Sequence, residues 1–221
     1  IELKDIKNFI NQTVCLENLI IVAGGDFELK EFEKLVKPLL ETLNVGKKAQ
    51  LEEVNFISKK EEKVLIKDTQ QAYIYFGSSF NINSKDEENY KAKVASFILG
   101  GSGFGSRLME EIRVKRGLAY SAYGSISINK SHSYFNGYLQ TKNETADEAK
   151  KLVGEIIEDF VKNGVTNDEL SAAKNFLTGS EPLRSETLSQ RLNRAFTLYY
   201  RGLEPNYSQK ELEKIQNLEL T

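Results

Sequence analysis

A cluster of four glycines within six residues narrows most strongly what this chain can fold into. It lies between an apolar helical pattern over residues 86–99 and a second, shorter one over residues 108–114. Its members are Gly100, Gly101, Gly103 and Gly105. Glycine adopts backbone angles that other residues avoid, and it lets a second backbone come close. The cluster therefore predicts a tight corner between two helices, with a backbone left open to close approach.

The cluster does not fit a phosphate-binding loop. Such a loop follows a strand, ends in Lys-Ser or Lys-Thr, and opens a helix whose N-terminus faces the phosphates. Here the glycines follow a helical pattern, and Arg107-Leu108 occupies the place of Lys-Ser or Lys-Thr. The spacing also differs from the dinucleotide-binding fingerprint. A nucleotide-binding module is thus disfavoured, although a binding test with ATP and NAD would be needed to exclude it.

Strand and helix patterns are mixed along the chain. Runs of branched and aromatic residues predict strands at 19–23, 64–66, 72–76, 120–128 and 134–140. Apolar residues at helical spacing predict helices at 4–10, 32–40, 86–99, 108–114, 149–160, 170–177 and 188–199. The polar residues 129–131 predict a hairpin turn. This order favours an α+β fold, a mixed and mainly antiparallel β-sheet layered with helices.

Capping residues place two helix starts more closely. Thr145 with Glu148, and Thr166 with Glu169, have the spacing of capping boxes. Gly164 is expected to end the helix that follows Thr145.

Composition excludes several classes of function. Lys and Arg total 30 against 32 Asp and Glu, so the basic excess that nucleic-acid binding needs is missing. The longest apolar run, residues 19–23, is far too short to span a membrane. The single cysteine, Cys15, excludes an internal disulfide. The compartment stays open, and either a bacterial-type cytoplasmic or a periplasmic location is compatible with the sequence.

Two residues after the glycine cluster are candidates for substrate binding. Arg113 falls near the end of the short helix, and Tyr120 begins the next strand. Lys115 and Arg116 are typical of a helix end capped by Gly117, where cations complement the helix dipole. Arg113 and Tyr120 instead offer a guanidinium fork and a phenol, donors that suit a peptide carbonyl and need no proton transfer.

Several segments together resemble a known family. They are Leu99-Gly100-Gly101, Ser106-Arg107-Leu108, Glu111-Ile112-Arg113, Gly117-Leu118-Ala119-Tyr120, residues 18–26 and residues 164–174. In this order they are similar to the C-terminal half of the pitrilysin/insulinase (M16) zinc peptidases, which include the mitochondrial processing peptidases. The resemblance covers nearly the whole chain.

The resemblance implies a protein of two similar halves. In that family the first half carries a His-x-x-Glu-His zinc motif, and the second carries an Arg and a Tyr seven residues apart that hold the substrate backbone. It implies this role for Arg113 and Tyr120, a peptide substrate, and zinc in the full-length parent. Residues 1–45 would close the catalytic half, 46–60 would be a linker, and 61–221 would form the substrate-binding half, stopping before its last strand.

The chain departs from the family in its metal ligands. A catalytic zinc takes three protein ligands and a water, but the sequence has one histidine, His132, one cysteine, Cys15, and no His-x-x-Glu-His. His132 lies in the polar turn, where exposure is the ordinary expectation, and Cys15 is expected in the core. We therefore predict no catalytic and no metal-binding residue in this chain, which alone should not hydrolyse peptides.

Two hypotheses about the parent remain. It is an active M16 zinc peptidase whose N-terminal catalytic half supplies the zinc, or it is a non-catalytic M16-like partner or scaffold subunit. Either could pair as a homo- or hetero-dimer. Retention of Arg113 and Tyr120 favours the active parent, because inactive members of the family usually lose both. An exposed strand edge could also bind a peptide by β-augmentation.

Overall fold

The computed structural model describes residues 1–52, 54 and 59–220. The chain forms two compact units, one made of residues 1–52 and 182–205 and the other of residues 53–181 and 206–221. Residues 53 and 55–58 of the predicted linker lie outside the described part. The assignment of residues 1–45, 46–60 and 61–221 to two halves and a linker stays a prediction.

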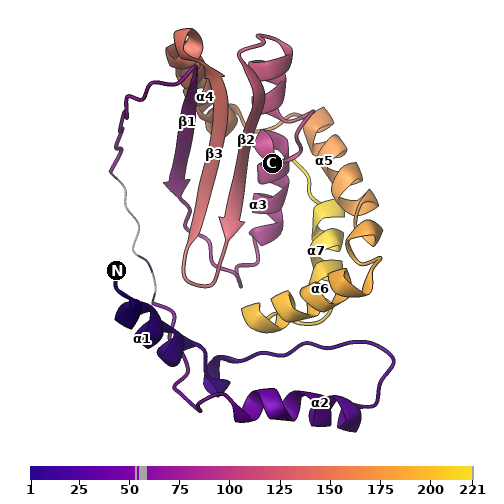
Figure 1. Cartoon of the computed structure of the whole chain (residues 1–221). Coiled ribbons are helices and arrows are strands. Elements are labelled where there is room, and N and C mark those ends of the chain that lie inside the picture. The colour runs from indigo at the N-terminus through magenta and orange to yellow at the C-terminus, as the bar shows by residue number, and fades with distance from the viewer. Residues whose placement is uncertain (53, 55–58, 221) are drawn as a thin grey trace. The chain divides into compact units, whose positions relative to one another are not determined.

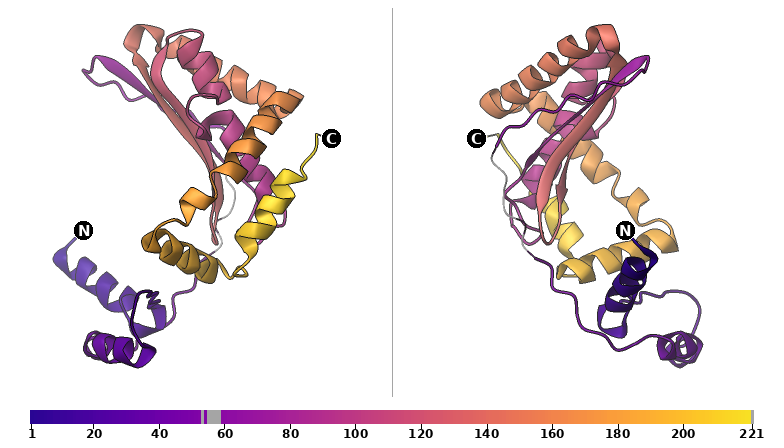
Figure 2. Two further views of the ribbon diagram at one scale, coloured as in Figure 1. Left: turned by 90° about the vertical axis from the view of Figure 1, so that its right-hand side faces the viewer. Right: turned by 60° about the vertical axis from the view of Figure 1, so that its left-hand side comes forward.

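Three strands form an antiparallel sheet in the second unit (Figure 1). They are β1 (Gln71–Ser79), β2 (Ala119–Ile128) and β3 (Ser133–Lys142), in the order β1-β3-β2. β2 and β3 are the two arms of a hairpin, as predicted, and β1 pairs with the other edge of β3. Helices cover one face of this sheet (Figure 2). The predicted α+β class is confirmed.

The helices follow the predicted order. Two of them, next to the glycine cluster, are short π-helical segments. The second unit contains α3 (Asn89–Ser96), the π-helical η2 (Phe97–Gly101) and η3 (Met109–Val114), η4 (Asn143–Thr145), α4 (Ala146–Asn163), α5 (Asn167–Gly179) and α7 (Tyr207–Gln216). The first unit contains α1 (Leu3–Thr13), η1 (Leu16–Asn18), α2 (Leu29–Glu41), η5 (Pro182–Arg184) and α6 (Leu188–Arg201).

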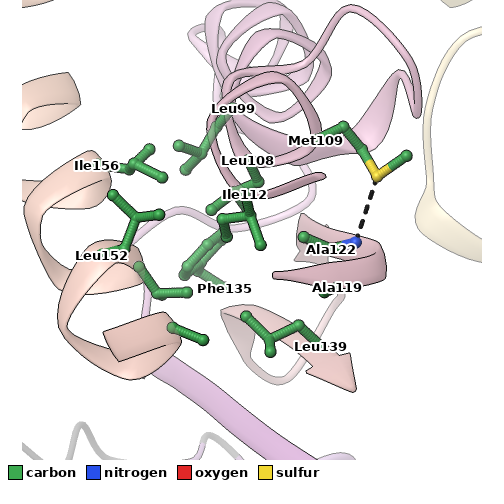
Figure 3. Packing of buried hydrophobic residues seen from close by; sticks show 12 residues of the cluster. Leu99, Leu108, Met109, Ile112, Ala119, Ala122, Phe135, Leu139, Leu152 and Ile156 are labelled. Atoms are coloured by element: carbon green, nitrogen blue, oxygen red, sulfur yellow. Dashed lines mark hydrogen bonds between the residues drawn. The ribbon is translucent and has the colours of Figure 1, made fainter. Parts of the chain in front are cut away.

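The main core lies between the sheet and the helices η2, η3 and α4 (Figure 3). Side chains alternate across a strand, so β3 turns Phe135 and Leu139 inward and Tyr134 and Tyr138 outward. Leu108, Ile112 and Leu139 are fully buried here. A second cluster joins α3, η2, α5 and α7 through Val94, Ile98, Leu170, Ala173, Leu177 and Ile215.

Two of the predicted strands are wrong. Residues 19–23 and 64–66 form no strand within the described part of the chain, and Ile66 is 95% exposed. Hydrogen bonds to a neighbour make a strand, and neither segment pairs with β1, β2 or β3. Apolar composition alone therefore overstated both.

One of the two predicted capping boxes forms. The Thr166 hydroxyl accepts a hydrogen bond from Glu169 N, and Glu169 accepts one from Thr166 N. The Thr145 box is wrong, because its hydroxyl bonds the buried Thr141 hydroxyl at 2.7 Å and does not cap α4. Gly164 ends α4 as predicted.

A close contact between two glycines sets the distance from η2 to the sheet. A Cβ added to Gly100 would lie 2.6 Å from Gly124 N, 2.7 Å from Gly124 O and 2.8 Å from Leu108 Cδ1. Gly124 lies in β2, and a Cβ there would also meet Leu108, at 2.9 Å. The close approach expected of the glycine cluster is thus made by the sheet of the chain itself.

We predict that Gly100→Ala destabilises the protein by about 1–3 kcal/mol, because the backbone of Gly124 would have to move. Gly154→Ala in α4 is the matched control, since its added Cβ meets nothing within 4 Å. That variant should gain about 0.5–1 kcal/mol from helix propensity. Urea denaturation measures both, and equal stability of the two variants would contradict the close contact.

Candidate functional site

Arg113 and Tyr120 come together where η3 turns into β2. Gly117 makes the turn with a φ of +63°, and its N–H donates to Arg113 O. The next N–H, that of Leu118, donates to Ile112 O. The Thr141 hydroxyl on β3 donates to Leu118 O at 2.5 Å. These bonds fix the start of β2 against the end of η3.

Burial holds η3 on the sheet beside this turn. Met109 and Ile112 are buried on one side of η3, and the backbone N–H of Ala122 donates to Met109 Sδ at 3.3 Å (Figure 3). The pairing of β2 with β3 is irregular between Ala119 and Ala122, as at a β-bulge, which re-aims the side chains next to it. Tyr120 lies in this irregularity and is 81% exposed.

The Arg113 guanidinium lies over two aromatic rings. Its Cζ is 4.5 Å from the centroid of Tyr120 and 4.5 Å from that of Phe104. Within the described part of the chain it makes no hydrogen bond or ion pair, and Tyr120 Oη likewise makes no hydrogen bond. Rings over a guanidinium contact its faces and leave the N–H bonds, which lie in its plane, free to donate. The site therefore presents unused donors beside an exposed phenol.

The two neighbouring cations are already paired. Lys115 Nζ and Arg116 Nη1 each lie 2.6 Å from a Glu111 carboxylate oxygen, and Arg116 also donates to Glu111 O. Hydrogen bonds from Lys115, and then from Arg116, lower the pKa of Glu111. Lys115 and Arg116 thus lie at the helix end, as expected, and also share the Glu111 carboxylate. Of the cations at this turn, Arg113 is then the one whose guanidinium has no acidic partner among the described residues.

The glycine loop, residues 102–106 between η2 and η3, presents Phe104, a residue that the sequence analysis missed. Gly103 and Gly105 have φ values of +66° and +103°, and an added Cβ on either would meet nothing within 4 Å. These two glycines are needed for their backbone angles, whereas Gly100 is needed for close approach. Phe104 between them is 67% exposed. An apolar residue among glycines was the available signal.

Arg107 ties this loop to the junction of α4 and α5. Its Nε donates to Glu169 Oε1 at 2.5 Å, and its Nη2 donates to Gly164 O at 2.7 Å. Asp159 lies 3.1 Å from Nη1, and Cζ lies 5.1 Å from the centre of the Phe160 ring. The side chain is 16% exposed. Arg107 therefore has a structural role within the second unit. Its bonds to Glu169, Gly164 and Asp159 are called the Arg107 clasp below.

His132 lies in the second unit and Cys15 in the first. His132 lies in a cavity of about 780 Å³ at the hairpin turn, where Nδ1 is 2.8 Å from the hydroxyl of the adjacent Ser131 and the ring stacks on Tyr134. Cys15 is buried in the first unit, with Gly46 against it. Among the described residues, no three His, Cys, Asp or Glu side chains gather where they could hold a metal ion. None of the described helices is long and apolar enough to cross a membrane.

Comparison with known proteins identifies the family. Residues 1–177 match the family model described as the peptidase M16 inactive domain. This chain therefore belongs to the M16 peptidase family, as the motifs predicted, and matches its inactive domain.

Some relatives of this chain are named as zinc proteases, and one is named as a non-peptidase homolog. A Helicobacter pylori protein called non-peptidase homolog YmxG is 44% identical over 220 residues, which are 100% of this chain and 51% of that protein. An uncharacterized zinc protease of Streptomyces coelicolor is 32% identical over 126 residues, 57% of this chain and 27% of that protein. The crystal structure of a peptidase M16 inactive domain from Pseudomonas fluorescens is similar with a TM-score of 0.79 at 25% identity, covering 99% of this chain and 52% of that one. The chain thus spans about half the length of the relatives that it matches along its whole length.

The Arg107 clasp should make the free energy of unfolding depend on pH. The hydrogen bond from Arg107 lowers the pKa of Glu169 from 4.5 to about 2. A lowered pKa in the folded state adds stability that is present above pH 4.5 and is lost as the pH falls towards 2. We expect Glu169→Gln to be less stable than wild type at pH 5, and the difference in unfolding free energy to shrink between pH 4.5 and 2. Urea denaturation across this range measures it, with the exposed Glu158→Gln as control; a difference that is constant with pH would contradict the clasp.

Proposed function

We propose that this chain is the peptide-holding, non-catalytic half of an M16-type protein. Arg113 and Tyr120 would donate hydrogen bonds to the backbone carbonyls of an extended peptide. The observation that carries the proposal is the Arg113 guanidinium itself, which lies over two aromatic rings and has no acidic partner among the described residues.

The chemistry of the two side chains supports a backbone carbonyl as the ligand. A guanidinium stays charged at any physiological pH and offers several donors in one plane. The Tyr120 phenol adds a second donor from the neighbouring strand. Neither group needs to gain or lose a proton, so the pair is suited to hold a peptide rather than to cut it.

We infer that the partner of this chain is the other half of the same M16-type protein. The helices α1 and α2 leave large apolar side chains exposed, among them Leu35 at 77%. Large exposed apolar patches usually mark an interface. The relatives matched along the whole chain are about twice as long, which leaves room for such a half.

Zinc would have to be held by that other half. The zinc-protease names of relatives associate the metal with the family, but the described residues of this chain do not fit a catalytic zinc, because they gather no three metal-ligating side chains. No catalytic step is therefore assigned to this chain.

A second candidate function is a partner or scaffold subunit whose parent does not cleave peptides. The name of the 44% identical relative favours it, whereas retention of Arg113 and Tyr120 favours an active parent. Zinc analysis and a quenched-fluorescence peptide assay on the full-length protein discriminate between the two. Bound zinc with cleavage supports the active parent, and peptide binding without either supports the non-catalytic one.

Arg113→Ala should weaken peptide binding by the full-length protein about ten- to a hundredfold, as loss of a charge-assisted hydrogen bond does. Tyr120→Phe should weaken it about two- to tenfold. If the parent is active, kcat/KM should fall about tenfold to a thousandfold in each variant, with zinc content unchanged. Fluorescence anisotropy with a panel of labelled, unstructured 15-residue peptides measures binding.

Arg116→Ala is the matched control, because that guanidinium is already bound to Glu111. It should bind the peptides as wild type does. Wild-type binding by Arg113→Ala, or an equal loss in Arg116→Ala, would contradict the assignment.

A further inference from the structure

We propose that Phe104 is a positioning residue for the substrate-binding guanidinium of Arg113. The inference rests on the proposed peptide-holding function and adds a third member to its site. Phe104 comes from the glycine loop, Arg113 from η3 and Tyr120 from β2. Three separate elements thus converge on one cation.

The geometry places the guanidinium within reach of two rings. Cζ of Arg113 is 4.5 Å from each ring centroid, well inside the 6 Å or so over which a cation is attracted to an aromatic face. Phe104 is 67% exposed, although a ring of its size usually gains by burial. Among the described residues, this ring contacts the guanidinium of Arg113, and that contact accounts for its exposed position.

The loop that carries Phe104 is anchored at its far end. Ser106 is fully buried, and both its hydroxyl, at 2.8 Å, and its N–H, at 3.0 Å, donate to Gly103 O. Met109 N donates to the Ser106 hydroxyl, which joins the turn to η3. Arg107 follows at once with its clasp to Glu169. The backbone on either side of Phe104 is therefore held in place, and the left-handed angles of Gly103 and Gly105 turn its ring outward to Arg113.

The consequence is preorganisation. An arginine side chain has many rotamers, and a ligand that must fix one of them binds more weakly. With rings of Phe104 and Tyr120 against it, the guanidinium keeps its position before the peptide arrives. Phe104 needs no contact with the peptide to act in this way, and its effect on binding should pass through Arg113.

The test is a double-mutant cycle in the full-length protein, read by anisotropy with the tightest-binding member of a panel of labelled, unstructured 15-residue peptides. Phe104→Ala should weaken binding about three- to tenfold, but it should have no further effect in the Arg113→Ala background. Phe104→Tyr, which keeps an aromatic face, should bind the peptide as tightly as wild type does, whereas Phe104→Leu should bind as weakly as Phe104→Ala. Phe176→Ala, which removes a half-exposed ring that packs in a tilted arrangement against Phe97, is the matched control and should bind as wild type does.

A second readout needs no peptide. In arginine-labelled protein, the NMR signals of the Arg113 side chain should carry ring-current shifts that decrease in Phe104→Ala and persist in Phe104→Tyr. Unchanged Arg113 shifts, an additive loss in the double mutant, or full binding by Phe104→Leu would each overturn the role of Phe104. Loss of binding in Arg113→Ala but not in Phe104→Ala would overturn this inference alone. Wild-type binding by Arg113→Ala would overturn the proposed function and this inference together.

Discussion

The close approach of Gly100 to Gly124 is the contact on which the geometry of the second unit depends. It brings the end of η2 onto β2, where a Cβ on either glycine would be too near its neighbours. Leu108 fills the space beside both glycines and is fully buried. With η2 and Leu108 fixed in this way, the glycine loop between them has its two ends set by the core. The loop can then present Phe104 without a helix or strand of its own.

From that contact the site follows in a few steps. Met109 and Ile112 bury η3 against the sheet, so Arg113 lies at the edge of the core with its charged end outside. Gly117 turns the chain at once into β2 and brings Tyr120 beside Arg113. The neighbouring Glu111 is used elsewhere, because it binds Lys115 and Arg116. Buried contacts thus carry a cation that lies over two aromatic rings and has no acidic partner among the described residues. The proposed peptide-holding half of an M16-type protein would need this arrangement.

Much of this was predictable from sequence, and the failures have physical causes. Alternating side chains foretold the β2–β3 hairpin, and the spacing of Thr166 and Glu169 foretold a capping box. Residues 19–23 and 64–66 misled because a strand depends on a partner that the segment itself does not reveal. Arg113 and Tyr120 came from the donor chemistry of their side chains together with resemblance to a family, whereas Phe104 stayed hidden because its contact with Arg113 arises only when the loop folds back. Nothing in the residue pattern revealed Gly124 as the partner of Gly100 either.

A structure of the full-length protein with one of the unstructured peptides bound would test the central claim most directly. We predict a backbone carbonyl of the peptide about 2.7–3.2 Å from a guanidinium nitrogen of Arg113, with the rings of Phe104 and Tyr120 still against that guanidinium. A peptide bound elsewhere, with Arg113 facing solvent or paired with an acid of the protein, would contradict the account.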